Sequence, residues 1–162
     1  MKILLIGMGN PILTDDAIGV RLAKDFKARL DRTLGIPPVS VVEECSVGGM
    51  NLLDVVSDWD RVIVLDSIKT PKGIPGTWHY FTAASLRETM NLSNVHDTNF
   101  ATALELGRRL GHKIPSDNEI HIFAVEIQDN ITFAEVMTPP LETAYPILSK
   151  EIFKEVLRLI QE

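Results

Sequence analysis

Four short segments of the chain are apolar on both faces and predict buried strands. The four segments are Lys2–Ile6, Val39–Glu43, Arg61–Leu65 and Glu119–Val125, and all are rich in β-branched residues. A fifth segment, Thr77–Thr82, alternates more regularly and carries aromatic residues, which is typical of an edge strand. The pattern therefore predicts a sheet with a buried centre.

Apolar positions recur with helical spacing in four other segments, namely Asp16–Leu30, Met50–Ser57, Asn99–Leu110 and Leu148–Ile160. Gly111 stands where a helix C-cap is expected. Strands that alternate with helices imply βαβ units, a mostly parallel sheet and helices on both of its faces. With 162 residues the chain is long enough to bury a core, so we expect one α/β domain over residues 1–162.

Composition and charge exclude several classes of protein. The net charge is −6 and no basic stripe stands out, which argues against a nucleic-acid partner. No apolar run approaches the ~20 residues that span a bilayer, and the start, MKILLIG, lacks the features of a signal peptide. A single cysteine, Cys45, excludes an internal disulfide and suits a reducing compartment. We therefore expect a cytoplasmic protein without membrane insertion.

Polar residues gather where the predicted parallel strands end, which is where α/β sheets bind ligands. Asn10, Asp15 and Asp16 follow the first of these strands, Glu44, Cys45 and Ser46 follow the second, and Asp66 follows the third. Glu126, Gln128 and Asp129 follow the strand Glu119–Val125, and Asn94, His96 and Asp97 precede the third long helix. The sequence thus predicts a functional site at the carboxyl edge of the sheet.

The adjacent aspartates Asp15 and Asp16 have two interpretations. Aspartate is a preferred helix N-cap and a favourable first-turn charge, and we expect one of the pair, with help from Thr14, to cap the following helix. Capping needs only one carboxylate, so the other is free to project into a cleft. Asp66, at the end of an apolar strand, is either a loop cap or a site residue.

His96 taken alone fits a surface loop. Together with Asp16 and Asp66 it offers one imidazole and two carboxylates, a set that suits zinc, nickel or iron. Cys45 fits a buried structural thiol better than a nucleophile, since no basic motif accompanies it. His121 alternates with apolar residues in a strand and is expected to pack there.

The chain resembles the hydrogenase maturation endopeptidases. GMGNPILTDDAIGVRLA is similar to the opening motif of that family, and VIVLDSIK to its second acidic segment. NVHDTNFATAL resembles its histidine segment, and EIQDNITF with MTPPLETAYP resembles its C-terminal region. The resemblance covers nearly the whole chain and departs from the family pattern at ECSVGGM and at Asp129.

The resemblance implies a three-layer α/β/α sandwich with a twisted, mostly parallel five-stranded sheet and one antiparallel strand, for which Thr77–Thr82 is the candidate. It implies metal contacts by Asp16, Asp66 and His96. Asp16, Asp66 and Glu44 are then the candidate catalytic residues. Asn10 and Gln128 are the residues that we expect to bind substrate.

The implied activity is removal of a C-terminal extension from the large-subunit precursor of a [NiFe] hydrogenase after nickel insertion. The nickel belongs to the substrate, and no permanent organic cofactor is expected; the mechanism is aspartic-type or metal-assisted. Two other functions stay open: a non-catalytic nickel-binding maturation chaperone, and a receiver-type phospho-acceptor domain. The second fits less well, because the acidic pair lies far beyond Ile6 and no lysine follows the last strand.

Overall fold

A five-stranded sheet forms the centre of the protein. The computed structural model describes residues 1–46, 50–88 and 95–162, without the side chains of residues 50, 87, 88 and 95–99. The strand order is β2-β1-β3-β5-β4. The strands are β1 (Ile3–Met8), β2 (Val39–Cys45), β3 (Arg61–Ile68), β4 (Trp78–Thr82) and β5 (Ile120–Glu126). Four of them run parallel, and β4 pairs antiparallel with β5 at one edge, which confirms the predicted antiparallel edge strand.

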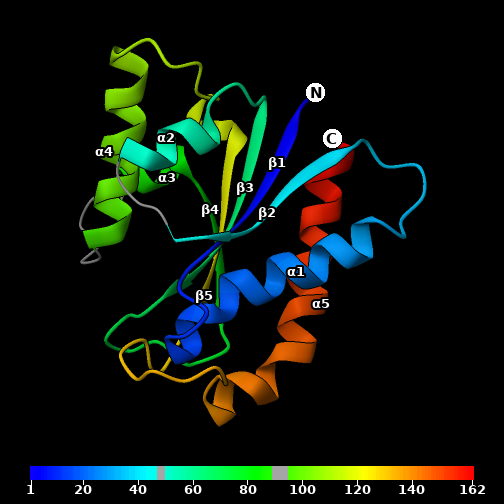
Figure 1. Ribbon diagram of the computed structural model, residues 1–162, viewed down its shortest axis with the longest axis vertical. Coiled ribbons are helices and arrows are strands. Elements are labelled where there is room, and N and C mark those ends of the chain that lie inside the picture. The colour runs from blue at the N-terminus through cyan, green and yellow to red at the C-terminus, as the bar shows by residue number, and fades with distance from the viewer. Residues whose placement is uncertain (47–49, 89–94) are drawn as a thin grey trace.

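Helices cover both faces of this sheet. In Figure 1, α1 (Ile18–Leu30) and α5 (Pro139–Gln161) lie on one side, and α2 (Met50–Val56), α3 (Ala83–Glu88) and α4 (Val95–Arg109) lie on the other. Two short 3₁₀ turns, η1 (Thr14–Ala17) and η2 (Asp117–Glu119), precede α1 and β5. The arrangement confirms the three-layer α/β/α architecture.

The sheet separates two apolar cores, and this explains why the central strand β1 lacks a polar face. On β1, Ile3 and Leu5 pack with the α1 and α5 side, whereas Leu4 and Ile6 pack with the α2 and α4 side. All four residues are at most 2% exposed. A central parallel strand is buried on both faces, so its sequence reads as a continuous apolar run.

The helix boundaries differ from the predicted ones in two informative places. Helix α5 begins at Pro139, well before the predicted Leu148, because the two prolines at its start occupy first-turn positions that need no N–H donor. Pro146 inside the helix hid the periodicity of that first half. The helix predicted from Asp16 begins at Ile18, because the two aspartates belong to η1.

Among the residues that the structure describes, no helix is both long and apolar enough to span a membrane.

Candidate functional site

The turn after β1 brings the acidic pair to the carboxyl edge of the sheet. Gly9 has a φ of 130°, and a Cβ added there would lie 2.0 Å from the carbonyl oxygen of Asp16. A Cβ on Gly19 would lie 2.3 Å from the carbonyl oxygens of both Met8 and Leu65. The glycines of the opening motif therefore let η1 and α1 pack directly against the ends of β1 and β3.

Asp15 is a structural residue. Its carboxylate is 0% exposed and accepts hydrogen bonds from the backbone N–H groups of Gln128 and Asp129, both at 3.0 Å, and of Thr138 at 2.7 Å. The Thr138 hydroxyl also donates to it, at 2.8 Å from Oδ2. Asp15 thereby ties both ends of the loop between β5 and α5 to η1.

The expectation that one aspartate caps α1 is wrong. The N-cap residue of α1 is Ala17 and that of η1 is Leu13, and no side-chain hydrogen bond caps either helix start. The helix continues directly out of the 3₁₀ turn, so its first N–H groups turn toward η1 rather than toward a capping side chain. Asp15 serves the distant loop instead.

Asp16 is partly buried, and both of its carboxylate oxygens are held. The Ser67 hydroxyl donates to Oδ1 at 2.8 Å, and the backbone N–H of Asn10 donates to Oδ2 at 2.9 Å. Each carboxylate oxygen has two lone pairs, so this arrangement fixes the direction of the group while leaving acceptor capacity on both oxygens. Asp16 is therefore an oriented carboxylate at the carboxyl edge.

Asp66 lies at the carboxyl end of β3, one residue before Ser67. Its Oδ1 accepts the backbone N–H of Ser67 at 2.7 Å. Ser67 thus contacts both predicted site aspartates, through its hydroxyl and its backbone. Ser67 was not predicted as a site residue, although its position directly after Asp66 in VIVLDSIK was the available signal.

His96 lies in the first turn of α4, and its side chain is outside the described residues. Among the side chains that are described, no three His, Cys, Asp or Glu residues gather closely enough to hold a metal ion. The three-residue metal site of Asp16, Asp66 and His96 stays a prediction.

The remaining candidates lie along the same edge. Glu44 is exposed near the end of β2, and the neighbouring Cys45 is buried at 3% exposure, which confirms the expected buried thiol. Asn10 is partly buried, and its side-chain oxygen accepts the N–H of Ile12 at 3.1 Å. Gln128 has an exposed side chain, while its backbone N–H bonds to Asp15.

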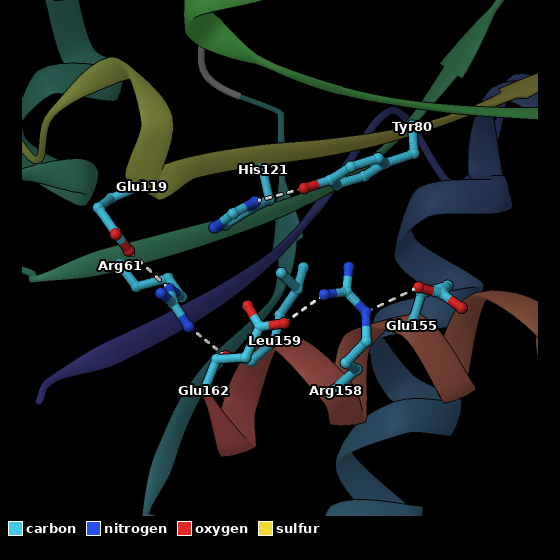
Figure 2. Close-up of polar contacts among 8 residues, drawn as sticks. All are labelled: Arg61, Tyr80, Glu119, His121, Glu155, Arg158, Leu159 and Glu162. Carbon is cyan, nitrogen blue, oxygen red and sulfur yellow. Dashed lines mark hydrogen bonds and ion pairs between the residues drawn. The ribbon is translucent and has the colours of Figure 1, made fainter.

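His121 does not belong to this edge, because it stands near the start of β5, at the opposite end of the sheet. Figure 2 shows its ring beside Tyr80, whose hydroxyl lies 2.9 Å from Nδ1, with the ion pair of Arg61 and Glu119 close by. Burial and then the charge of Arg61 lower the pKa of His121. The expected packing role is confirmed.

Asp129, where the sequence departs from the family pattern, organises the loop after β5. Its Oδ1 accepts the N–H groups of Ile131 at 2.8 Å and Thr132 at 3.0 Å. The Thr132 hydroxyl and these backbone groups lower the pKa of Asp129 to about 2. Asp129 is therefore a permanently ionised group beside the candidate site at neutral pH.

Comparison with known proteins gives one consistent family. Residues 20–155 match the family model described as hydrogenase maturation protease. Hydrogenase 2 maturation protease of Escherichia coli (strain K12) is 36% identical over 77 residues, which is 48% of this chain and 44% of that protein. The chain thus aligns with less than half of the length of this relative.

Solved structures extend the similarity along the chain. The hydrogenase maturating endopeptidase HybD from E. coli has a TM-score of 0.71 at 25% identity, over 96% of this chain and 92% of that one. The [NiFe] hydrogenase maturation protease HybD from Thermococcus kodakarensis shares the fold, with a TM-score of 0.73 at 18% identity over 97% and 99%. Because the family model spans most of the sequence, the chain belongs to the hydrogenase maturation protease family.

Proposed function

We propose that this chain is a cytoplasmic endopeptidase that removes the C-terminal extension of a [NiFe] hydrogenase large-subunit precursor after nickel insertion. In this proposal Asp16, Asp66 and His96 recognise the nickel that the substrate already carries. Family membership supports the activity, and the fixed orientation of Asp16 is the single observation that supports the site.

The different environments of the two adjacent aspartates support the choice of Asp16, and not Asp15, as the site residue. Asp15 is fully buried and its oxygens are engaged by the loop between β5 and α5. Asp16 is partly buried, lies next to the end of β3, and keeps lone pairs on both oxygens. A carboxylate held in one direction binds a metal or a water molecule without first losing rotational freedom.

The chemistry required is hydrolysis of one peptide bond. A water molecule attacks the scissile carbonyl carbon, its proton passes to a carboxylate, and a proton is delivered to the leaving nitrogen as the C–N bond breaks. Asp16 or Asp66 acts as this base in the aspartic-type route, whereas polarisation of the water by the substrate nickel defines the metal-assisted route. Both routes use the same two carboxylates.

Three further residues complete the proposed site. Glu44, exposed near the end of β2, is a third carboxylate for proton transfer. Asn10 precedes η1 and Gln128 follows β5 in the chain, and their side-chain amides suit hydrogen bonding to the backbone of an extended peptide. Neutral His96 and ionised carboxylates are the metal-binding forms, so recognition weakens as His96 is protonated.

Incubation of the protein with a nickel-loaded large-subunit precursor tests the activity. We expect a small, defined mass loss from the precursor, and none with the Asp16→Asn variant. A stable complex without mass loss would contradict the protease and favour a nickel-binding chaperone.

A further inference from the structure

Four large apolar side chains stand in solvent close to the candidate site. Phe133 is 77% exposed, Ile131 76%, Val136 69% and Ile12 46%. We call these four side chains the apolar rim. Single exposed apolar residues are ordinary on protein surfaces, whereas a group of them on adjoining segments indicates a binding surface.

The two segments that carry the apolar rim are joined through their backbones. The Thr14 N–H donates to the carbonyl of Ala134 at 3.1 Å, and the Ala134 N–H donates to the carbonyl of Ile12 at 3.0 Å. The Thr14 hydroxyl donates to the carbonyl of Thr132 at 2.5 Å. Hydrogen bonds therefore hold the segment around Ile12 against the residues around Ala134.

The loop that carries three of the four side chains is also fixed at its ends. The buried Asp15 carboxylate binds backbone groups of Gln128, Asp129 and Thr138, as described above. Met137, in the same loop, points into the core and is 6% exposed. The loop thus buries Met137 together with Ile127, which is 4% exposed, and displays Ile131, Phe133 and Val136. A preordered loop loses little conformational entropy when a partner binds.

The apolar rim adjoins the residues of the proposed site. The N–H of Asp16 donates to the carbonyl of Leu13 at 3.0 Å, directly after Ile12 in the chain. The ionised carboxylate of Asp129 and the exposed Glu135 lie on the same loop as Phe133. A partner that reaches Asp16 consequently meets an apolar surface bordered by negative charge.

We propose that the apolar rim docks an apolar segment of the large-subunit precursor that is flanked by basic residues, next to the extension that is removed. This inference depends on the proposed function, which makes a protein the substrate. Side chains buried at the centre of an interface supply most of its affinity, and Phe133 is the largest member of the rim.

A second copy of this chain fits the surface less well. A two-fold contact through this surface would bring Asp129 and Glu135 of both copies into one interface, and like charges in an interface oppose association. Four side chains also provide only part of the ~800 Å² that each partner buries in a standard interface. With the precursor, the proposed site itself provides the remaining contact.

Kinetics with Phe133→Ser and Ile131→Ser provide the first test. We expect KM for the nickel-loaded precursor to rise by about tenfold in each variant with kcat nearly unchanged, because docking and not chemistry is weakened. Leu34→Ser and Ile147→Ser are matched controls, since both side chains are exposed, at 96% and 67%, outside this loop. An unchanged KM in the rim variants, or an equal rise in the controls, would overturn the proposal.

Cross-linking tests docking without requiring cleavage. A photoreactive benzoylphenylalanine at position 133 should cross-link to the nickel-loaded precursor, whereas the same group at position 34 should not. Cross-links only between copies of this chain, or none to the precursor, would overturn the inference. Absence of cleavage together with a cross-link at position 133 would refute the proposed protease while supporting the docking surface, so the two failures are distinguishable.

Discussion

The hydroxyl of Ser67 donates a 2.8 Å hydrogen bond to Oδ1 of Asp16, and so links the end of β3 to the turn that follows β1. The backbone N–H of the same serine binds Asp66. Ser67 is thus the residue through which the two predicted site carboxylates share one support.

Replacement of Ser67 by alanine should lower kcat by about tenfold or more, because Asp16 loses the donor that sets its direction. The free energy of unfolding should fall by only about 1 kcal/mol, the usual net value of one hydrogen bond. Ser67→Thr keeps the hydroxyl and should retain much of the activity. Steady-state cleavage of the precursor measures both variants, and full activity of Ser67→Ala would count against the supporting role.

The two adjacent aspartates should respond oppositely to mutation. Asp15→Ala leaves the partly buried backbone N–H groups of Gln128, Asp129 and Thr138 without an acceptor, and it should reduce the free energy of unfolding by on the order of 3 kcal/mol or more. Asp16→Ala should lower the free energy of unfolding by only about 1 kcal/mol and should abolish cleavage. Denaturant unfolding and activity assays check this separation; similar losses of stability in both variants would contradict it.

His121 should make the protein less stable in mild acid. Its pKa in the folded state is lowered, chiefly by burial, so the unfolded chain takes up its proton at higher pH. The unfolded state then binds more protons, and the free energy of unfolding falls as the pH drops below about 6.5. His121→Phe should show a smaller loss of the free energy of unfolding between pH 7.5 and 5.5 than the parent in urea unfolding. An equal loss in the parent and in His121→Phe would exclude His121 as the cause.

The ionised Asp129 carboxylate should keep its hydrogen bonds to the loop backbone down to an unusually low pH. Its folded-state pKa of about 2 lies below the ordinary 3.8, so its stabilising contribution is complete above about 4 and disappears as the pH falls toward about 2. The amide chemical shifts of Ile131 and Thr132 report this titration in NMR spectra. A midpoint near 3.8 in the folded protein would show that the Asp129 carboxylate lacks these hydrogen bonds, and Asp129→Asn should show no such titration.

Much of the fold was predictable because its signals are local. The doubly apolar strands, the alternating Thr77–Thr82 and the glycine after α4 each carry their own pattern. The first half of α5 was missed because three prolines interrupt that pattern. Helix α3 was missed because six residues give too little periodicity to recognise.

The site was only partly predictable because its contacts are distant in sequence. Position alone suggested that one of Asp15 and Asp16 is structural, but the capping role assigned to it was wrong. The actual partners of Asp15 are Gln128, Asp129 and Thr138, which lie 113, 114 and 123 residues away. The link from Ser67 to Asp16 spans 51 residues, and no local pattern indicates it.

Cleavage by metal-free enzyme tests the proposed nickel recognition most directly. Nickel-loaded and nickel-free precursors are incubated in parallel with the chelator-treated protein, and the mass of the precursor is followed. We expect that only the nickel-loaded precursor is cut and that the enzyme needs no added metal, because in the proposed site Asp16, Asp66 and His96 bind an ion that the substrate supplies. Equal cutting of both precursors, or activity only after zinc is added to the enzyme, would contradict it.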